Sequence, residues 1–256
     1  MALVLQRTRN AIREQGVGAF AVRVGRRVVT AAQACLALRK HPTFSSPDAL
    51  LDYADNAFGQ LIRPLQVRSE IRALLEVVER KKPKTVLEIG TANGGTLFLW
   101  SRVAAPDAHL VSVDLPNGIH GGGYADWRIP IYHRFAMPRQ KIDLIRGNSH
   151  SPAIIEKTKH LLNGHSADFL FIDAGHRYSD VKQDFENFSP LVSEGGIIAL
   201  HDVAHHPDES LCEIDRYWRE LKDKHESAQF IERSDQGWGG IGYVRWASPL
   251  DVASSD

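Results

Sequence analysis

The sequence predicts an α/β fold, a doubly wound sheet of seven strands that ends in an antiparallel hairpin. From Thr85 onward, short runs rich in branched and aromatic residues alternate with segments of helical periodicity. Continuous apolar strands separated by helices are typical of a parallel sheet covered on both faces. The last two runs are joined by a short turn at 234–237, which favours an antiparallel pairing.

Each element is expected from its local pattern. The strands are 85–89, 109–114, 142–146, 168–173, 196–201, about 228–233 and 238–246. Helices are expected near 47–59, 69–80, 94–105, 151–163, 177–189 and 208–225, the first with Ser46 as its cap. The chain then divides into a basic helical arm over 1–46, a helical lead-in over 47–84, the α/β domain over 85–247 and a disordered tail over 248–256.

Composition limits the class of protein. The 256 residues include 31 Lys and Arg and 31 Asp and Glu, and a formal net charge of zero argues against a nucleic-acid-binding protein. Cys35 and Cys212 are far apart, which excludes a disulfide framework and a Cys-rich zinc site and favours a cytoplasmic location. The sequence has no apolar run long enough for a transmembrane helix.

The N-terminal arm carries most of the charge asymmetry. Residues 1–41 contain eight Lys and Arg residues against one acid, Glu14, with an apolar stripe between them. We expect a helix that packs on the main domain or on a second copy of the chain. We also expect the protein to be a homo-oligomer. Two alternatives stay open: a basic helix on anionic lipid at the inner face of a membrane, and a cleaved targeting peptide.

A glycine-rich loop follows the first expected strand. Gly90 permits a tight turn, and Gly94 and Gly95 would let a ligand approach the backbone. Asp114 ends the second strand, where an acidic residue can hold the ribose hydroxyls of a nucleoside. The glycine spacing is not that of a dinucleotide-binding fingerprint, which disfavours a nicotinamide-dependent oxidoreductase. A sharp strand–helix turn without any ligand would also explain these glycines.

Acidic and imidazole side chains follow the fourth and fifth strands. Because ligands of open α/β sheets bind outside the carboxyl ends of the strands, Asp173, His201 and Asp202 should converge beside the glycine loop. Together they are candidate ligands for a divalent cation, since carboxylates suit Mg²⁺ and an imidazole suits Mn²⁺. In the structural alternative, Asp173 caps the next helix and His201 bonds to Asp202 without a metal.

A long insertion over 116–141 separates the second and third strands. Its glycines and aromatic residues predict an active-site lid, with Tyr124 and Trp127 toward the substrate, or else a segment packed in an oligomer. Beyond the fifth strand, His205 is a further candidate for substrate contact, and we expect either His205 or its neighbour His206 to face solvent.

The pattern E-x-G-x-x-x-G-x-T from Glu88 to Thr96, together with Asp114, resembles the class I S-adenosylmethionine-dependent methyltransferases. The resemblance implies a Rossmann-like seven-stranded sheet in which Gly90 and Gly94 line the methionine part, Asp114 holds the ribose and 147–149 lies beside adenine. The cofactor-binding residues that it implies are Glu88, Gly90, Thr91, Ala92, Gly94, Thr96, Asp114, Leu115, Asn148, Ser149 and Asp173.

A second pattern is more specific. D-x-G-H-x-Y from Asp173 to Tyr178, followed by a G-G-x-x-x-x-x-D strand that ends at Asp202, resembles the metal-dependent sugar and macrolide O-methyltransferases, grouped with cephalosporin-hydroxylase-like proteins. The resemblance covers roughly residues 66–246. It implies that Asp173 and Asp202 hold Mg²⁺ and that His176 is the base, and His201 stands where the family pattern has Glu.

The implied function is methyl transfer from S-adenosylmethionine to a hydroxyl of a sugar, glycoside or glycan, with Mg²⁺ or Mn²⁺ as the second cofactor. His176 and Asp173 would be catalytic, and Tyr124, Trp127, Tyr178 and His205 would face the substrate. Three alternatives stay open: a methyltransferase for catechol-like or natural-product small molecules, a hydroxylase-like relative, and a non-catalytic S-adenosylmethionine-binding protein.

Overall fold

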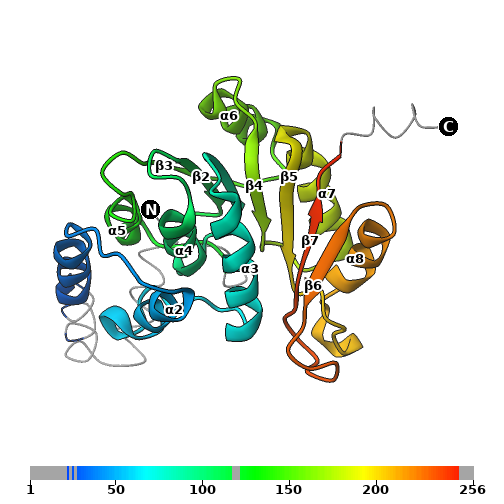
Figure 1. Ribbon diagram of the computed structural model, residues 1–256, viewed down its shortest axis with the longest axis horizontal. Coiled ribbons are helices and arrows are strands. Elements are labelled where there is room, and N and C mark those ends of the chain that lie inside the picture. The colour runs from blue at the N-terminus through cyan, green and yellow to red at the C-terminus, as the bar shows by residue number, and fades with distance from the viewer. Residues whose placement is uncertain (1–21, 23–24, 26–27, 117–121, 248–256) are drawn as a thin grey trace.

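Within the described residues, seven strands form one mixed sheet in the order β3-β2-β1-β4-β5-β7-β6 (Figure 1). The structure is a computed structural model that describes residues 28–116 and 122–247, together with Val22 and Gly25. The strands are β1 (Thr85–Ile89), β2 (His109–Asp114), β3 (Lys141–Arg146), β4 (Ala167–Ile172), β5 (Val192–His201), β6 (Ser227–Phe230) and β7 (Ile241–Arg245).

The strand pairing confirms the predicted fold class. Strands β1 to β5 pair in parallel, whereas β7 runs antiparallel to both β5 and β6. The connection between β6 and β7 is longer than the expected turn at 234–237. Gly239 and Gly240 have φ of 72° and 82°, and their carbonyls accept bonds from Ala204 and Val203. This loop is therefore held against the end of β5, and β7 begins only at Ile241.

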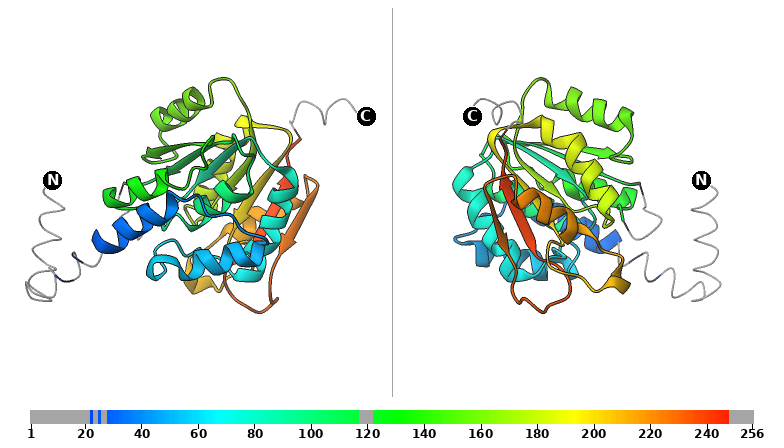
Figure 2. Two further views of the ribbon diagram at one scale, coloured as in Figure 1. Left: turned by 60° about the vertical axis from the view of Figure 1, so that its left-hand side comes forward. Right: turned by 90° about the vertical axis from the view of Figure 1, so that its right-hand side faces the viewer.

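Helices cover both faces of the sheet (Figure 2). One layer holds α2 (Pro47–Asn56), α3 (Arg68–Lys81), α4 (Gly95–Val103) and α5 (Ile129–His133), and the other holds α6 (Pro152–Leu162), α7 (Tyr178–Phe188) and α8 (Ile214–Lys222). The short 3₁₀ helices are η1 (Ala57–Gly59), η2 (Asp126–Arg128), η3 (Ser189–Leu191) and η4 (Asp208–Ser210). Alternate residues of a strand serve the two layers: Phe169 packs in the first apolar cluster and Leu170 in the second.

Helix boundaries follow local signals with one clear exception. Ser46 caps α2 as expected, since its hydroxyl accepts the Ala49 N–H at 3.2 Å. The expected single helix 208–225 is wrong over its first six residues. Leu211 has φ of 57°, a left-handed conformation that interrupts a helix, so η4 is separate and α8 begins at Ile214.

The described part of the basic arm is a helix over 28–38. Ala34 and Leu38 are fully buried in the apolar cluster of the first layer, whereas Val28, Val29 and Leu36 are exposed. The expectations for residues 1–21 and for the tail 248–256 lie outside the described residues. Among the described helices, none has both the length and the apolar character needed to span a bilayer.

Gly90, which follows β1, occupies a position where no side chain fits. Its φ is 96°, and an added Cβ would lie 1.8 Å from the carbonyl oxygen of Asp173. Gly195 offers a comparison because it also has positive φ, 68°, but apart from its own chain neighbours no atom of the described residues lies within 4 Å of an added Cβ.

We expect Gly90→Ala to lower the free energy of unfolding by more than about 3 kcal/mol, because β1 and β4 would have to separate. The control Gly195→Ala adds only the left-handed strain of about 1 to 2 kcal/mol. Urea denaturation of both variants measures the difference. Equal losses in the two variants would contradict the proposed backbone contact.

Candidate functional site

The carboxyl ends of β1, β2, β4 and β5 meet at one edge of the sheet. The strand order reverses between β1 and β4, which is where open α/β sheets bind ligands. The Gly90 N–H donates to Val113 and the Asp173 N–H donates to Ile89, at 2.9 and 2.8 Å. The backbone just beyond each strand is thereby tied to its neighbour, so the residues that follow the strands are held side by side.

Asp114 fixes the glycine loop. Its Oδ2 accepts the N–H groups of Thr91 and Ala92 at 3.0 and 2.7 Å, and its Oδ1 accepts the N–H of Leu115 at 2.7 Å. Burial raises the pKa of Asp114 above its usual value, and these three bonds oppose that rise. Because a carboxylate has about four acceptor positions, Asp114 can still receive a further donor. Beside it, Leu115 presents an apolar surface that is 41% exposed.

The protein itself fills the space where a Cβ would stand on Gly94 and Gly95. An added Cβ on Gly94 would lie 2.5 Å from the Tyr132 ring, and one on Gly95 would lie 2.5 Å from Pro64. Tyr132 also donates from its hydroxyl to the Ala92 carbonyl at 2.7 Å. Tyr132 is fully buried, so this part of the insertion packs in the core instead of standing free as a lid.

Glu88 lies beneath the loop with no exposed surface. Its carboxyl oxygens accept hydrogen bonds from Thr96 and Ser112 at 2.7 and 2.8 Å. Burial raises the pKa of Glu88 to about 8, although the two hydroxyl bonds lower it in part. Thr91, whose hydroxyl lies 2.5 Å from that of Ser112, is also buried. These groups therefore support the loop from below.

The loop after β3 lies on the far side of Asp114. The Gly147 N–H donates to the Asp114 carbonyl at 2.8 Å, which places the next residues at the same edge. Asn148 accepts the His150 N–H at 3.0 Å, and the Ser149 carbonyl accepts the Asn187 side chain at 3.5 Å. Asn148 and Ser149 are therefore the residues that follow the backbone contact between Gly147 and Asp114.

Asp173, His201 and Asp202 lie close together, as the sequence predicts. Each offers a ligand atom within 4.8 Å of the other two. The His201 Nδ1 lies 3.3 Å from Asp173 and 3.4 Å from Asp202. Asp173 does not cap α7, whose N-cap is Arg177; its other oxygen accepts the Gln66 amide at 2.6 Å.

The protonation of this cluster follows from its charges. Burial lowers the pKa of His201, but the carboxylates of Asp173 and Asp202 outweigh burial and raise it to about 10. Burial raises the pKa of Asp202, but its bonds to His201 and His206 hold it well below the usual range. Without a cation, His201 therefore carries a proton between the two carboxylates. The same donor set, two carboxylates and an imidazole, suits a divalent cation that replaces this proton.

His176 lies beside the cluster and faces solvent. Its Nε2 is 3.4 Å from Asp202 Oδ2, and its side chain is 57% exposed. The His176 carbonyl accepts the Glu213 N–H at 2.8 Å, which anchors the loop before α7. An accessible imidazole next to a carboxylate can take a proton from a bound hydroxyl.

The four residues expected to face the substrate do not gather in one place. Tyr124 is buried and stacks edge-on against Tyr132, and Trp127 is half-buried on the same side. On the side of α8, Tyr178 donates from its hydroxyl to Glu220 at 2.8 Å, and His205 is exposed, 3.4 Å from Asp215.

Sequence reasoning missed several residues of the site. Gln66 reaches Asp173 from a loop that carries no motif, and Tyr132 fills the space over Gly94. His206 is buried with its Nε2 3.4 Å from Asp202 Oδ1, while His205 is the neighbour that faces solvent. Cys212 joins the same corner. Because Asp202 and His206 lie in an irregular segment and not on a helix, their four-residue spacing does not indicate this contact.

The raised pKa of Glu88 predicts a pH dependence of stability. The folded state holds a proton that the unfolded state releases above the ordinary glutamate pKa of 4.5, so this stabilisation is full below that pH and is lost as the pH rises toward about 8. We expect Glu88→Gln to flatten the fall in the free energy of unfolding by about 1.4 kcal/mol per pH unit within this window. Urea denaturation across the window measures it, and parallel pH profiles for wild type and variant would contradict it.

Comparison with known proteins agrees with this architecture. Residues 87–203 match the model of a family described as a methyltransferase domain. The chain is similar to the uncharacterised protein y4gI of Sinorhizobium fredii, at 28% identity over 68% of this chain and 18% of that protein. It is also similar to the uncharacterised protein R132 of Acanthamoeba polyphaga mimivirus, at 30% identity over 58% of this chain and 63% of that protein. The chain spans less than two thirds of either relative.

Solved structures share the fold. An O-methyltransferase from Bacillus cereus in complex with SAH matches with a TM-score of 0.51 and 18% identity over 80% of this chain and 92% of that one. The O-methyltransferase TomG from Streptomyces achromogenes, solved with SAM, matches with a TM-score of 0.51 and 14% identity over the same shares. Residues 87–203 are therefore similar to a methyltransferase domain, and the chain shares the Rossmann-like fold of these solved O-methyltransferases.

Proposed function

We propose that this protein transfers a methyl group from S-adenosylmethionine to a hydroxyl of a sugar, glycoside or glycan, with a divalent cation at Asp173, His201 and Asp202. The observation that carries the proposal is the position of this cluster, one strand away from the Asp114-held loop. A donor bound over the ends of β1 and β2 and an acceptor bound over the ends of β4 and β5 would be neighbours.

We use the term donor corner for Asp114, Leu115 and the glycine loop, where the methyl donor would bind. This corner suits the nucleoside part of S-adenosylmethionine. Asp114 retains acceptor capacity for ribose hydroxyls, and the exposed face of Leu115 is suited to an apolar base. Gly90 and the backbone of the loop would border the methionine part, with Glu88 and Thr96 fixing the loop from below. When bound, S-adenosylmethionine supplies a methyl group activated by a positive sulfur.

The acceptor corner, formed by Asp173, His201 and Asp202 with His176 beside them, suits an alcohol whose hydroxyl has a high pKa. An alcohol is a weak nucleophile, so a divalent cation, which favours the deprotonated form of a coordinated hydroxyl, would supply the activation. Asp173 and Asp202 would hold that cation with His201, and Gln66 would orient Asp173. His176 would take the hydroxyl proton as the carbon–oxygen bond forms and the methyl–sulfur bond of the donor breaks, leaving neutral S-adenosylhomocysteine, and Asp202 would stabilise the resulting imidazolium.

The acceptor class is tested directly with methyl-labelled S-adenosylmethionine and a panel of glycosides, glycans and catechols. Label in glycosides supports the proposal. Label in catechols alone would move the function to a small-molecule methyltransferase, and no label in any acceptor despite cofactor binding would support a non-catalytic protein.

We expect Asp114→Ala to weaken S-adenosylmethionine binding roughly 10- to 100-fold, the cost of losing hydrogen bonds to a charged group. Asp126→Ala is the control, because this exposed carboxylate on the same side pairs with Arg146 and does not touch the loop. Isothermal titration measures both. Wild-type affinity in Asp114→Ala would rule out the assigned ribose contact.

Turnover is expected to need both the cation and His176, and the loss of one can be distinguished from the loss of the other. Treatment with EDTA should abolish turnover in the wild type, and added Mg²⁺ or Mn²⁺ should restore it, whereas Asp173→Asn should not recover. His176→Gln should respond to metal but remain roughly 100- to 10,000-fold slower, with unchanged cofactor affinity. Full activity of exhaustively metal-free wild type would refute the cation's role, and normal turnover in His176→Gln would refute the base.

A further inference from the structure

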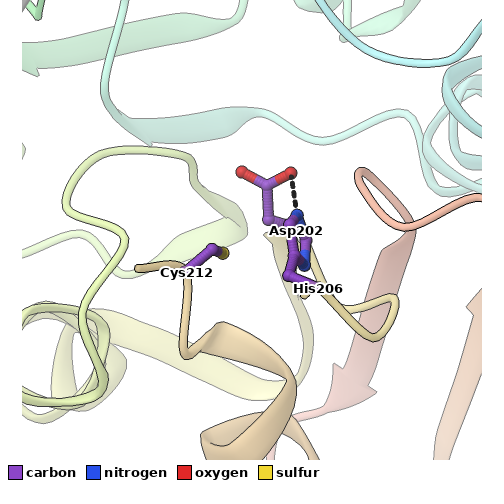
Figure 3. A group of neighbouring side chains, drawn as sticks. All are labelled: Asp202, His206 and Cys212. Carbon is purple, nitrogen blue, oxygen red and sulfur yellow. Dashed lines mark ion pairs between the residues drawn. The ribbon is translucent and has the colours of Figure 1, made fainter. Parts of the chain in front are cut away.

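Asp202, His206 and Cys212 form a second group of potential metal ligands, which shares Asp202 with the first cluster (Figure 3). They converge from the end of β5, from the loop that follows it and from the segment before α8. Their ligand atoms lie within 4.8 Å of one another, and His206 Nε2 is 3.4 Å from Asp202 Oδ1. A carboxylate, an imidazole and a thiol therefore share one corner.

The side chains of this group are held by further bonds. His206 Nδ1 lies 2.8 Å from the Ala204 carbonyl, so Nδ1 carries a hydrogen, and Nε2, 3.4 Å from Asp202 Oδ1, is the nitrogen at which a metal ion would take the place of a proton. Asp202 Oδ1 accepts the Gly239 N–H at 3.1 Å. Metal-binding histidines in proteins commonly donate their second ring N–H to a backbone carbonyl, and ligating carboxylates are commonly hydrogen-bonded as well.

The backbone at this corner is strained. Asp202 and Leu211, the residue before Cys212, have φ of 62° and 57°, which only glycine adopts without cost. Leu211 is 68% exposed, so no burial of its side chain compensates for the strain. The Cys212 N–H donates to the Ser210 hydroxyl at 3.2 Å. The chain thus bears a local cost in a conformation that turns Cys212 toward His206 and Asp202.

We propose that Asp202, His206 and Cys212 bind a Zn²⁺ ion. Sulfur and nitrogen donors select a borderline-soft metal over Mg²⁺, and the combination of Cys, His and carboxylate is one that Zn²⁺ accepts. Zinc–ligand distances of about 2.0 to 2.3 Å place tetrahedral ligands about 3.3 to 3.8 Å apart. The present spacing closes to that value with small side-chain movements.

The fourth coordination position borders a pocket. His206 and Cys212 both line a hollow of about 430 Å³, together with His205, Arg177 and Arg216. Three protein ligands with an open fourth position are the arrangement of zinc sites that bind water or a substrate oxygen. A solvent water or an oxygen atom of a molecule in this pocket would complete the coordination.

The zinc site goes beyond the proposed methyl transfer, because Asp173 and His201 are not among its ligands. Asp202 presents Oδ2 to His201 and His176 and Oδ1 to His206, so its two oxygens face different histidines. Loss of the zinc site and loss of the cation at Asp173 can therefore be told apart by substitutions that each remove one unshared ligand.

The test uses the full chain, freed of metal and titrated with Zn²⁺ against a chromogenic chelator, and then with Co²⁺. We expect one tight Zn²⁺ per chain, with affinity at least about tenfold weaker in Cys212→Ser and in His206→Gln. Co²⁺ in the wild type should give the near-ultraviolet charge-transfer absorption of a thiolate ligand, and Cys212→Ser should lack it.

Matched controls separate this site from others. Cys35→Ser removes the other cysteine of the chain, His205→Gln removes the exposed neighbour of His206, and Asp173→Asn removes an unshared ligand of the first cluster. All three should keep the cobalt–thiolate absorption. Absence of that absorption in the wild type, or its persistence in Cys212→Ser, would overturn the proposal, as would equal Zn²⁺ affinity in the wild type and both ligand variants. The wild-type cobalt spectrum is decisive even if a variant fails to fold.

Discussion

The close approach of β1 and β4 is the constraint on which the rest of the structure depends. Gly90 has no side chain, so the Asp173 carbonyl can occupy the space where a Cβ would stand. With the parallel register of β1 between β2 and β4, this contact puts Asp114, Gly90 and Asp173 at one edge. Backbone packing alone therefore makes the donor corner at Asp114 a neighbour of the acceptor corner at Asp173.

Asp202 organises the charges at this edge. Three imidazoles face it, those of His176, His201 and His206, and the Gly239 N–H bonds to it. Its backbone is left-handed, with φ of 62°, a conformation that costs free energy for a residue with a side chain. A carboxylate with histidines on both sides can share protons or cations with either, which links the proposed methyl-transfer site and the proposed zinc site through one residue.

The sequence predicted the sheet and the convergence of Asp173, His201 and Asp202 because strand ends follow from periodicity, and parallel strands end at one edge. It could not predict Gln66 or Cys212, which reach the site from irregular segments whose paths depend on tertiary packing. Tyr132 was missed as a filler of the glycine loop because an aromatic residue in an insertion has no periodic signal. The late start of α8 depends on the left-handed backbone of Leu211. Leucine rarely adopts that conformation, so the residue type gave no reason to expect it.

A crystal structure with S-adenosylhomocysteine and Mn²⁺ tests the central claim most directly. The account predicts nucleoside density against Asp114 and Leu115, and an anomalous peak among Asp173, His201 and Asp202. A blocked edge above β1 and β2, or manganese bound elsewhere while this cluster keeps its present hydrogen bonds, would contradict it.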